Sequence, residues 1–369
     1  MKQGKRVIIS GGGTGGHIFP AIAIANALKR IAPDTEILFV GAKNRMEMEK
    51  VPAAGYRIMG LDIQGFQRKS LLKNIFLPFK MLKSIYDSVS IIKKFKPDVA
   101  IGVGGYASGP LLYAAGKMNV PYLIQEQNSY AGITNTYLGK NAKQICVAFE
   151  GMSQFFPADK IKLTGNPIRK DSVAIAHKRA DAFEYFGLSA DKKTILVLGG
   201  SLGAGTLNKC MLAGLYEIIN ANVQLIWQTG PSYYTEIRRS LPKKHQCIKV
   251  YEFLNRMDFA YAAADMIISR AGAGTIAELC AVGKPTILGP SPNVAEEQQT
   301  KNAEALVERK ATFLIRDSDA EQKLVKAALN LIVDTQKGTE LGQNMTKMAL
   351  LNADEVIANE ILKTANEWS

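Results

Sequence analysis

The sequence of 369 residues is 47% hydrophobic and 21% charged, a composition that excludes disordered and fibrous proteins. A chain of this length is longer than a domain with a single hydrophobic core usually is, so two domains are expected. Its formal net charge of +13 favours an anionic partner, whether nucleotide phosphate, nucleic acid or an anionic membrane surface. No apolar run is long enough for a signal peptide or a membrane span, and the four cysteines form no Cys-x-x-Cys pair, so we expect a soluble, cytoplasmic protein with reduced thiols.

Short apolar runs rich in β-branched residues alternate with segments of helical period along the chain. Strands flanked by helices in this way indicate parallel sheets covered on both faces, and therefore the α/β class. The predicted strands are residues 7–10, 36–40, 99–103, 122–125, 144–149, 194–199, 224–228, 249–253, 266–270 and 286–290.

A strand runs into a glycine-rich turn twice in each half of the chain. The four segments are VIISGGGTGG, VAIGVGGYASG, ILVLGGSLGAG and IISRAGAGT. This repeat predicts two similar doubly wound domains whose glycine loops lie at the carboxyl ends of strands and face one cleft. We expect a first domain at 1–165, a second at 166–345, and a C-terminal helix at 346–369 that could pack back across either domain.

The first glycine loop, GGGTGGHIFP at 11–20, can be interpreted in several ways. Its Gly-x-Gly-x-x-Gly pattern is typical of dinucleotide binding, but residues 41–44 lack the acidic residue expected after the second strand. A histidine stands where a Walker A loop has its lysine. The loop N–H groups at a helix N-terminus can instead meet a phosphate or a sugar. The remaining alternative is that the glycines only allow tight packing.

His17 is one of three histidines and the only one in a glycine loop. An imidazole has a pKa of about 6.5 and can take a proton at neutral pH. We therefore expect His17 to be a general base that activates a hydroxyl, kept neutral by the helix N-terminus. The alternative is that His17 hydrogen-bonds the backbone and orders the loop.

The segment 68–96 carries eight basic residues and one acidic residue, and apolar residues recur in it at helical spacing. One stripe comprises Leu72, Ile75, Phe79, Leu82, Tyr86 and Val89, and Phe76, Leu77 and Met81 lie off it. The segment predicts either a surface for anionic lipid headgroups or an amphipathic helix that covers the sheet, and Pro78 is expected to interrupt the helix. The residues expected to face a membrane are Phe76, Phe79, Lys80 and Lys83.

Two further turns, around Ser201 and at 270–275, are expected to receive anions. Glu278 follows the second of these turns. Its carboxylate can accept both hydroxyls of a ribose, or it can form a capping box with Thr275 at the start of the next helix.

Two other polar groups follow in the second half. Gln298 and Gln299 carry amides that can donate and accept toward sugar hydroxyls. Asp317-Ser318-Asp319 resembles the Asp-x-Asp with which many glycosyl-transfer enzymes hold a metal, but its position favours a turn. We therefore expect a site without metal that relies on loop amides and helix dipoles.

The ordered set of motifs resembles the bacterial N-acetylglucosaminyltransferases of peptidoglycan synthesis. The segments are GGGTGGHIFPA, GGYASGP, QEQN followed by AGITN, TGNPIR, GGSLGA, GAGTIAE and EEQQTKNA. The resemblance implies a GT-B architecture of two Rossmann-like domains. It also implies inverting transfer of N-acetylglucosamine from UDP-N-acetylglucosamine (UDP-GlcNAc) to the muramoyl 4-hydroxyl of undecaprenyl-linked lipid I, giving lipid II.

The resemblance further implies that no metal or other cofactor is needed, and that the enzyme lies peripherally on the cytoplasmic face of the inner membrane beside cell-wall synthesis proteins. The acceptor would bind the first domain and the donor mainly the second, with His17 similar to the histidine proposed as base. The residues implied to bind substrate are Thr14, Gly15, Gly16, Asn128, Arg169, Ser201, Leu254, Ala273, Gly274, Thr275, Glu278, Gln298 and Gln299.

Some positions depart from the family pattern. Gln125 replaces a frequent histidine, Leu202 replaces a frequent glutamine, and Glu296-Glu297 replace an acidic and basic pair. Three other classes stay open: a nicotinamide-dependent oxidoreductase, a nucleotide-sugar epimerase on a similar scaffold, and a basic nucleic-acid binder. The last lacks interleaved base-stacking aromatics and a recognisable module.

Overall fold

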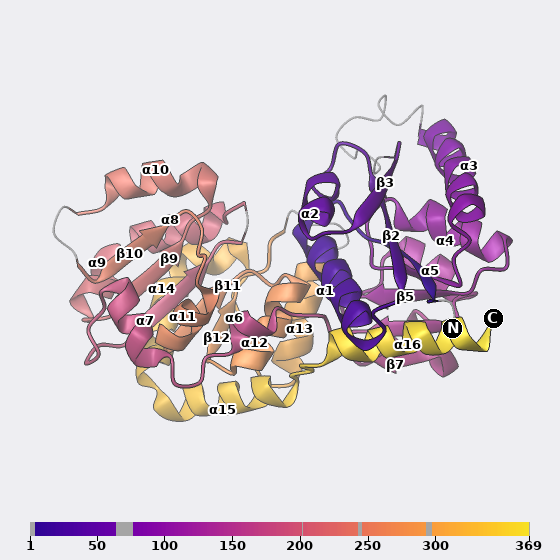
Figure 1. The fold of residues 1–369 in the computed structure, drawn as a ribbon. Coiled ribbons are helices and arrows are strands. Elements are labelled where there is room, and N and C mark those ends of the chain that lie inside the picture. The colour runs from indigo at the N-terminus through magenta and orange to yellow at the C-terminus, as the bar shows by residue number, and fades with distance from the viewer. Residues whose placement is uncertain (1–3, 64–76, 201, 243–245, 293–296, 369) are drawn as a thin grey trace. The chain divides into compact units, whose positions relative to one another are not determined.

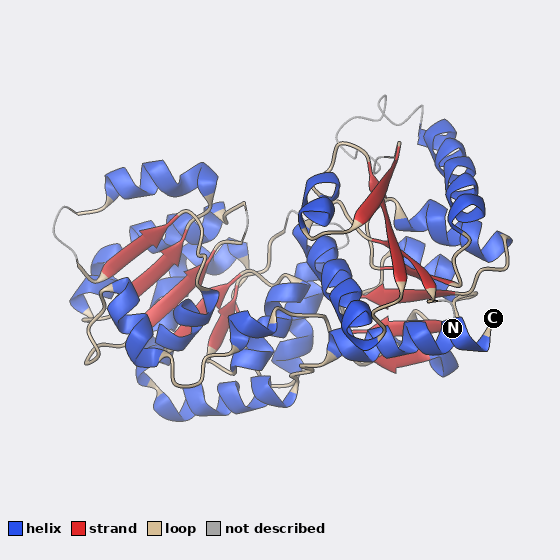
Figure 2. Ribbon diagram, viewed as in Figure 1, coloured by secondary structure: helices blue, strands red, loops and turns tan. Residues whose placement is uncertain are grey.

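The computed structural model describes residues 4–63, 77–200, 202–242, 246–292 and 297–368 (Figure 1). The chain divides into two compact units. The N-terminal unit comprises Met1–Ile168 and Leu350–Ser369, and the C-terminal unit comprises Arg169–Ala349. Each unit is built on one parallel sheet with helices on both faces (Figure 2).

The N-terminal unit has a sheet of seven described strands. In sheet order they are β3 (Arg57–Leu61), β2 (Glu36–Ala42), β1 (Arg6–Ser10), β4 (Val99–Gly102), β5 (Tyr122–Glu126), β6 (Gln144–Val147) and β7 (Ile161–Leu163). The helices of this unit are α1 (Gly15–Ile31), α2 (Glu47–Ala53), α3 (Leu77–Phe95), α4 (Ser108–Lys117), α5 (Ile133–Gly139) and α16 (Ala353–Glu367).

The C-terminal unit has a sheet of six described strands. In sheet order they are β10 (Ile248–Tyr251), β9 (Gln224–Gln228), β8 (Thr194–Leu198), β11 (Met266–Ser269), β12 (Thr286–Leu288) and β13 (Phe313–Leu314). The helices of this unit are α6 (Lys170–Val173), α7 (Arg179–Phe186), α8 (Gly205–Ala213), α9 (Leu215–Asn220), α10 (Pro231–Ser240), α11 (Met257–Ala263), α12 (Ala273–Val282), α13 (Gln298–Glu308), α14 (Asp317–Val333) and α15 (Thr335–Lys347).

Both sheets run in the same order, which confirms the prediction of two doubly wound, Rossmann-like domains. The first strand of each sheet is flanked by the second on one side and the fourth on the other, so the strand order reverses between β1 and β4 and between β8 and β11. Ligands of such sheets bind outside the carboxyl ends of the strands at this switch point. The four glycine turns follow these four strands, which explains why the turns occur twice in each half.

The C-terminal helix α16 packs on the N-terminal unit. Its apolar residues Ile357 and Ile361 are fully buried in the same core cluster as Ile9 of β1 and Ile18 of α1. At the helix edge, the Arg30 guanidinium donates to a carboxylate oxygen of Glu355 at 2.9 Å. The last helix of the chain therefore completes the core of the first unit.

Helix α3 packs through a narrow face and leaves apolar residues exposed. Ser84 and Ser88 are buried, whereas Phe79, Leu82 and Tyr86 are exposed by 71%, 66% and 74%. Of the two alternatives for this stripe, covering the sheet is therefore wrong for these three residues. None of the helices in the described part of the chain is long and apolar enough to cross a membrane.

The expected interruption of the helix at Pro78 stays a prediction, because α3 is described only from Leu77 onward. The remainder of the basic segment, including Phe76, lies outside the described residues.

Candidate functional site

The turn between β1 and α1 presents the N-terminus of a 17-residue helix. Thr14 is the N-cap residue, no described side chain caps this end, and the first turn contains no acidic residue. The helix offers no acceptor to the N–H groups of Thr14, Gly15 and Gly16. Backbone N–H groups and the helix dipole therefore make this turn receptive to an anion.

The His17 side chain is held in one tautomer by the glycine loop. Its Nδ1 lies 3.0 Å from the carbonyl oxygen of Gly12, and because a carbonyl only accepts, Nδ1 carries the proton and Nε2 keeps its lone pair. Burial lowers the pKa of His17, while the Gly12 hydrogen bond and the charge of Glu47 oppose the shift. His17 is thus neutral at pH 7, and its loop-ordering contact leaves Nε2 able to accept a proton.

The second glycine turn lies against the first. Gly12 N–H donates to the carbonyl oxygen of Gly104 at 3.3 Å. Gly104 has a φ of +91°, and a Cβ at this position would lie 2.8 Å from Nε2 of His17. The glycine therefore keeps open the space beside the nitrogen that carries the lone pair.

Glu47, a residue that the sequence motifs did not single out, contacts the same loop. Its side chain is buried and accepts hydrogen bonds from Gly13 N–H at 2.9 Å and Ala42 N–H at 3.0 Å. The acidic residue missing after the second strand is thus supplied by the first residue of α2. No motif spacing marks it, because the turn between β2 and α2 brings the carboxylate back to the loop.

Asn128 lies in a loop organised by Glu126 at the end of β5. Glu126 is buried and accepts from the Asn128 N–H at 3.1 Å, the Gly132 N–H at 3.3 Å and the Asn135 amide at 2.7 Å. Burial raises the pKa of Glu126 despite these donors. Gln125, at the position of the family histidine, donates its amide to Asn166 in the interior.

In the C-terminal unit, the turn after β11 leads into α12. Gly272, which has no side chain to cap the helix, is the N-cap residue, and the helix begins at Ala273. The capping-box interpretation of Glu278 is therefore wrong, because Glu278 lies more than a full turn inside the helix. No other heavy atom lies within 4 Å of where a Cβ of Gly274 would stand, so there is open space beside the first turn. Ser201, in the turn after β8, lies outside the described residues.

The structure brings Glu278 and Arg169 together. The Arg169 Nη2 lies 3.8 Å from Oε1 of Glu278, and the Tyr261 hydroxyl donates to Oε2 at 2.9 Å. Burial raises the pKa of Glu278, whereas Arg169 and Tyr261 act in the opposite direction. Oε2 therefore accepts a hydrogen bond from the protein, whereas Oε1 faces Arg169 at a distance too long for a hydrogen bond.

The two glutamines lie at the start of α13. Gln299 accepts from the Ser291 N–H at 2.8 Å, which ties the loop after β12 to this helix, and Gln298 is the first residue of α13. Leu254 is buried in the loop between β10 and α11. These residues all follow carboxyl ends of strands in the C-terminal unit.

The Asp-x-Asp sequence is occupied by protein partners. Arg270 donates to both oxygens of Asp317, and the Thr206 hydroxyl donates to Asp317 at 2.7 Å. Asp319 pairs with Lys323 at 3.3 Å. Among the described residues, no histidine, cysteine and carboxylate side chains form a cluster that could hold a metal ion.

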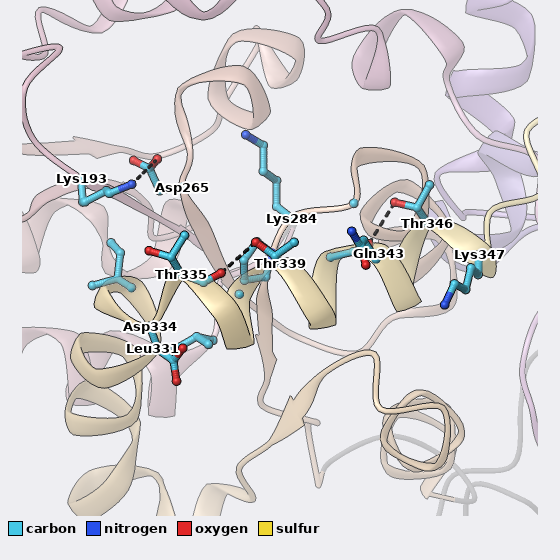
Figure 3. A pocket seen from close by; sticks show the side chains of 15 residues that line it. Lys193, Asp265, Lys284, Leu331, Asp334, Thr335, Thr339, Gln343, Thr346 and Lys347 are labelled. Carbon is cyan, nitrogen blue, oxygen red and sulfur yellow. Dashed lines mark hydrogen bonds and ion pairs between the residues drawn. The ribbon is translucent and has the colours of Figure 1, made fainter.

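A cavity of about 660 Å³ lies at the opposite ends of the strands in the C-terminal unit (Figure 3). Lys193, Asp265 and Lys284 line it together with α15, and Lys193 lies 3.7 Å from Asp265. Burial and the nearby Arg179 lower the pKa of Lys284. The predicted site residues do not line this cavity, so it is distinct from the candidate site.

Comparison with known proteins gives consistent results for both units. The glycosyltransferase family 28 N-terminal domain matches residues 7–147, and the C-terminal domain of the same family matches residues 194–361. A relative from Parabacteroides distasonis, named UDP-N-acetylglucosamine--N-acetylmuramyl-(pentapeptide) pyrophosphoryl-undecaprenol N-acetylglucosamine transferase, is 54% identical over 97% of this chain and 98% of its own.

Two solved structures share the fold. The crystal structure of Acinetobacter baumannii MurG has a TM-score of 0.80 at 29% identity, covering 97% of this chain and 99% of its own. A UDP-GlcNAc 2-epimerase from Neisseria meningitidis has a TM-score of 0.67 at 16% identity, covering 97% and 100%, a likeness that concerns the fold alone. The chain therefore belongs to glycosyltransferase family 28 and, within it, to the pyrophosphoryl-undecaprenol N-acetylglucosamine transferases.

Proposed function

We propose that this chain transfers N-acetylglucosamine from UDP-GlcNAc to the muramoyl 4-hydroxyl of lipid I and so forms lipid II, with His17 as the base. The observation that carries the proposed mechanism is the His17 tautomer, since Nδ1–H is donated to Gly12 and Nε2 keeps its lone pair next to an anion-receptive helix end. Family membership supports the same reaction.

The proposed step is a single displacement. Nε2 of His17 takes the proton of the acceptor 4-hydroxyl, the oxygen attacks the anomeric carbon, and the bond from that carbon to the UDP oxygen breaks, with inversion. The leaving UDP carries the electron pair away as negative charge. Backbone N–H groups at helix N-termini and a guanidinium can stabilise that charge without a metal.

The donor contacts are proposed from the C-terminal unit. The first turn of α12, from Ala273 to Thr275, would receive phosphate, with Arg169 supplying a positive charge. The Oε1 side of Glu278 would accept ribose hydroxyls, and the backbone at Leu254 would contact uracil. Asn128, Gln298 and Gln299 are the proposed contacts of the donor sugar, and Thr14, Gly15 and Gly16 those near the diphosphate.

The competing functions make different predictions for one assay. We would measure UDP release from UDP-GlcNAc with and without a short-chain lipid I analogue, in the presence of a metal chelator. The transferase requires the acceptor and keeps its rate with chelator. An epimerase releases UDP without acceptor, and a complete lack of release reopens the nicotinamide alternative.

The role of His17 is tested by His17→Ala. A positioned general base contributes about 10²–10⁴-fold, so turnover should fall by that order while UDP affinity stays near wild type. His177→Ala is the matched control, because His177 is exposed and lies in the other unit. Near-normal turnover of His17→Ala would refute the base assignment.

We also propose that α3 docks the enzyme peripherally on the anionic cytoplasmic face of the inner membrane. The exposed apolar residues Phe79, Leu82 and Tyr86 lie beside Lys80 and Lys83, a combination suited to the boundary between headgroups and acyl chains.

The vesicle test replaces Phe79 and Leu82 with serine and measures co-sedimentation with anionic vesicles. We expect release of the double variant and retention of Tyr216→Ser, since Tyr216 is 66% exposed but lies on α9 of the C-terminal unit. Unchanged co-sedimentation of the double variant would count against docking through α3.

A further inference from the structure

The carboxylate of Glu47 is enclosed by backbone N–H donors and by glycines that leave room for it. One oxygen accepts from Ala42 N–H and the other from Gly13 N–H, at 3.0 and 2.9 Å, and the residue is 1% exposed. A Cβ at Gly12 would lie 2.2 Å from Oε1, and a Cβ at Gly41 would lie 2.6 Å from Cγ. Both glycines are therefore needed for this side chain to fit.

A buried carboxylate is costly unless its charge is compensated. The two N–H groups satisfy one lone pair on each oxygen but carry no net charge. The charge of Glu47 acts on His17, where it raises the pKa against the effect of burial. When His17 accepts a proton, a cation forms in a partly buried position. The two side chains adjoin the same residue, since the Gly12 carbonyl accepts from Nδ1 of His17 and a Cβ on Gly12 would meet Oε1 of Glu47, so the carboxylate lies near enough to stabilise that cation.

We propose that Glu47 is a positioning residue for the transfer, which fixes the glycine loop through Gly13 and stabilises the imidazolium formed on His17. This inference rests on the proposed role of His17 as base. Glu47 also differs from the acidic residue of dinucleotide-binding proteins, which binds a ribose. Its carboxylate binds the protein's own backbone, so it is not available to a ribose of a nicotinamide cofactor.

The charge effect is measured first without substrate. Only three histidines occur in the chain, so the pKa of His17 can be followed by NMR in protein labelled at histidine carbons. In Glu47→Gln the His17 pKa should fall, because the opposing charge is removed while burial persists. Glu49→Gln is the matched control on the same helix, since Glu49 is exposed, and it should leave the titration unchanged.

The kinetic test separates charge from geometry. In Glu47→Gln the acid limb of the pH profile of kcat/KM should move to lower pH, and kcat should fall by about tenfold or more, as a weaker base gives less of the general-base effect. KM for UDP-GlcNAc should change little. In Glu47→Asp the charge remains but cannot reach both N–H groups, so kcat should fall while the limb moves less than in Glu47→Gln.

A purely structural role would lower kcat without moving the His17 titration or the acid limb, and that result overturns the charge assignment. If Glu47→Gln does not fold, amide exchange in the wild type decides the loop assignment. Gly13 N–H should exchange slowly although it lies in a surface turn, and exchange as fast as at an unprotected loop amide would overturn it. The NMR and exchange results stand even if His17→Ala proves active, so the two proposals can fail separately.

Discussion

At the scale of single residues, the space beside His17 depends on Gly104. A side chain there would meet the imidazole, since a Cβ would lie 2.6 Å from Cδ2, and the φ of +91° is itself unfavourable for an L residue. Gly104→Ala should therefore displace the ring and reduce turnover by about a hundredfold or more, with UDP affinity retained. The measurement is steady-state turnover beside calorimetric UDP binding.

Gly151→Ala is the control for backbone strain. Gly151 has a φ of +78°, and no heavy atom lies within 4 Å of where its Cβ would stand, so alanine there brings strain without a clash. Both variants should lose about 1–3 kcal/mol of stability. If the two variants had equal turnover, backbone strain alone would account for the effect of Gly104→Ala, and the contact of Gly104 with His17 would be irrelevant to turnover.

Removing the charge of Glu278 should have opposite effects on the stability of the protein and on its affinity for UDP. Burial raises the pKa of Glu278 in the folded state, so the unfolded state loses this proton at lower pH. The protonated form of Glu278 therefore favours folding at low pH, and this contribution to the free energy of unfolding is lost as the pH rises through the folded pKa. At neutral pH, Glu278→Gln should therefore raise the melting temperature of the free protein but weaken UDP binding.

The pH dependence of UDP binding checks the same residue. As pH falls through the raised pKa of Glu278, the carboxylate is protonated and the wild-type dissociation constant for UDP should rise. Isothermal titration at several pH values should show this rise in the wild type and a flatter profile in Glu278→Gln. Parallel profiles would show that Glu278 is not a ribose acceptor.

Sequence patterns identify the chemistry of some site residues but not their local partners. A histidine in a glycine loop indicates a base, and the structure adds the tautomer that makes Nε2 the accepting atom. Glu47 could not be found in this way, because its role depends on a turn that returns the carboxylate to Gly13. The Arg169 and Glu278 pair joins residues more than a hundred positions apart, a proximity that no spacing encodes.

At the scale of elements, the central strands are predictable, whereas of the four described strands at sheet edges only β10 is. All ten predicted strands occur, and nine of them are central strands, which in a parallel sheet are continuous apolar runs. The missed strands β3, β7 and β13 all lie at a sheet edge, and their residues are largely exposed or intermediate.

Helix α3 shows why periodicity did not identify the buried face. Its packed positions include Ser84 and Ser88, whose hydroxyls donate to backbone carbonyls, that of Ser84 to Asp62 at 3.3 Å and that of Ser88 to Ser84 at 2.6 Å. A hydrophobicity pattern assigns such serines to the solvent and the exposed phenylalanine to the core.

Helix α16 permits a test of how the N-terminal unit is stabilised. Ile361→Ala should cost about 2–5 kcal/mol, because Ile361 is fully buried in the core cluster where α16 packs on α1 and β4. Hydrogen exchange by mass spectrometry should show the loss in peptides of the N-terminal unit. Val333→Ala, at a residue that is 73% exposed on α14, should have little effect. Equal losses in both units would contradict a local role for α16.

At the scale of the whole molecule, the net charge of +13 should act together with the apolar residues of α3 at a membrane. The electrostatic part is screened, since the Debye length falls from about 10 Å at 0.1 M salt to about 3 Å at 1 M. Binding to anionic vesicles should therefore weaken with added NaCl. Vesicles of zwitterionic lipid should bind less and show little salt dependence, and salt-insensitive binding to anionic vesicles would contradict this account.

The position of α16 has a consequence for the order in which the protein can be made. Synthesis proceeds from the N-terminus, and domains usually fold in that order as they leave the ribosome. Here the first unit lacks Ile357 and Ile361 until residues 169–349 have been made. The N-terminal unit must therefore wait, with an incompletely covered sheet, until α16 has been synthesised. A translation product that stops before α16 would therefore contain a complete second unit and a first unit whose core lacks this helix.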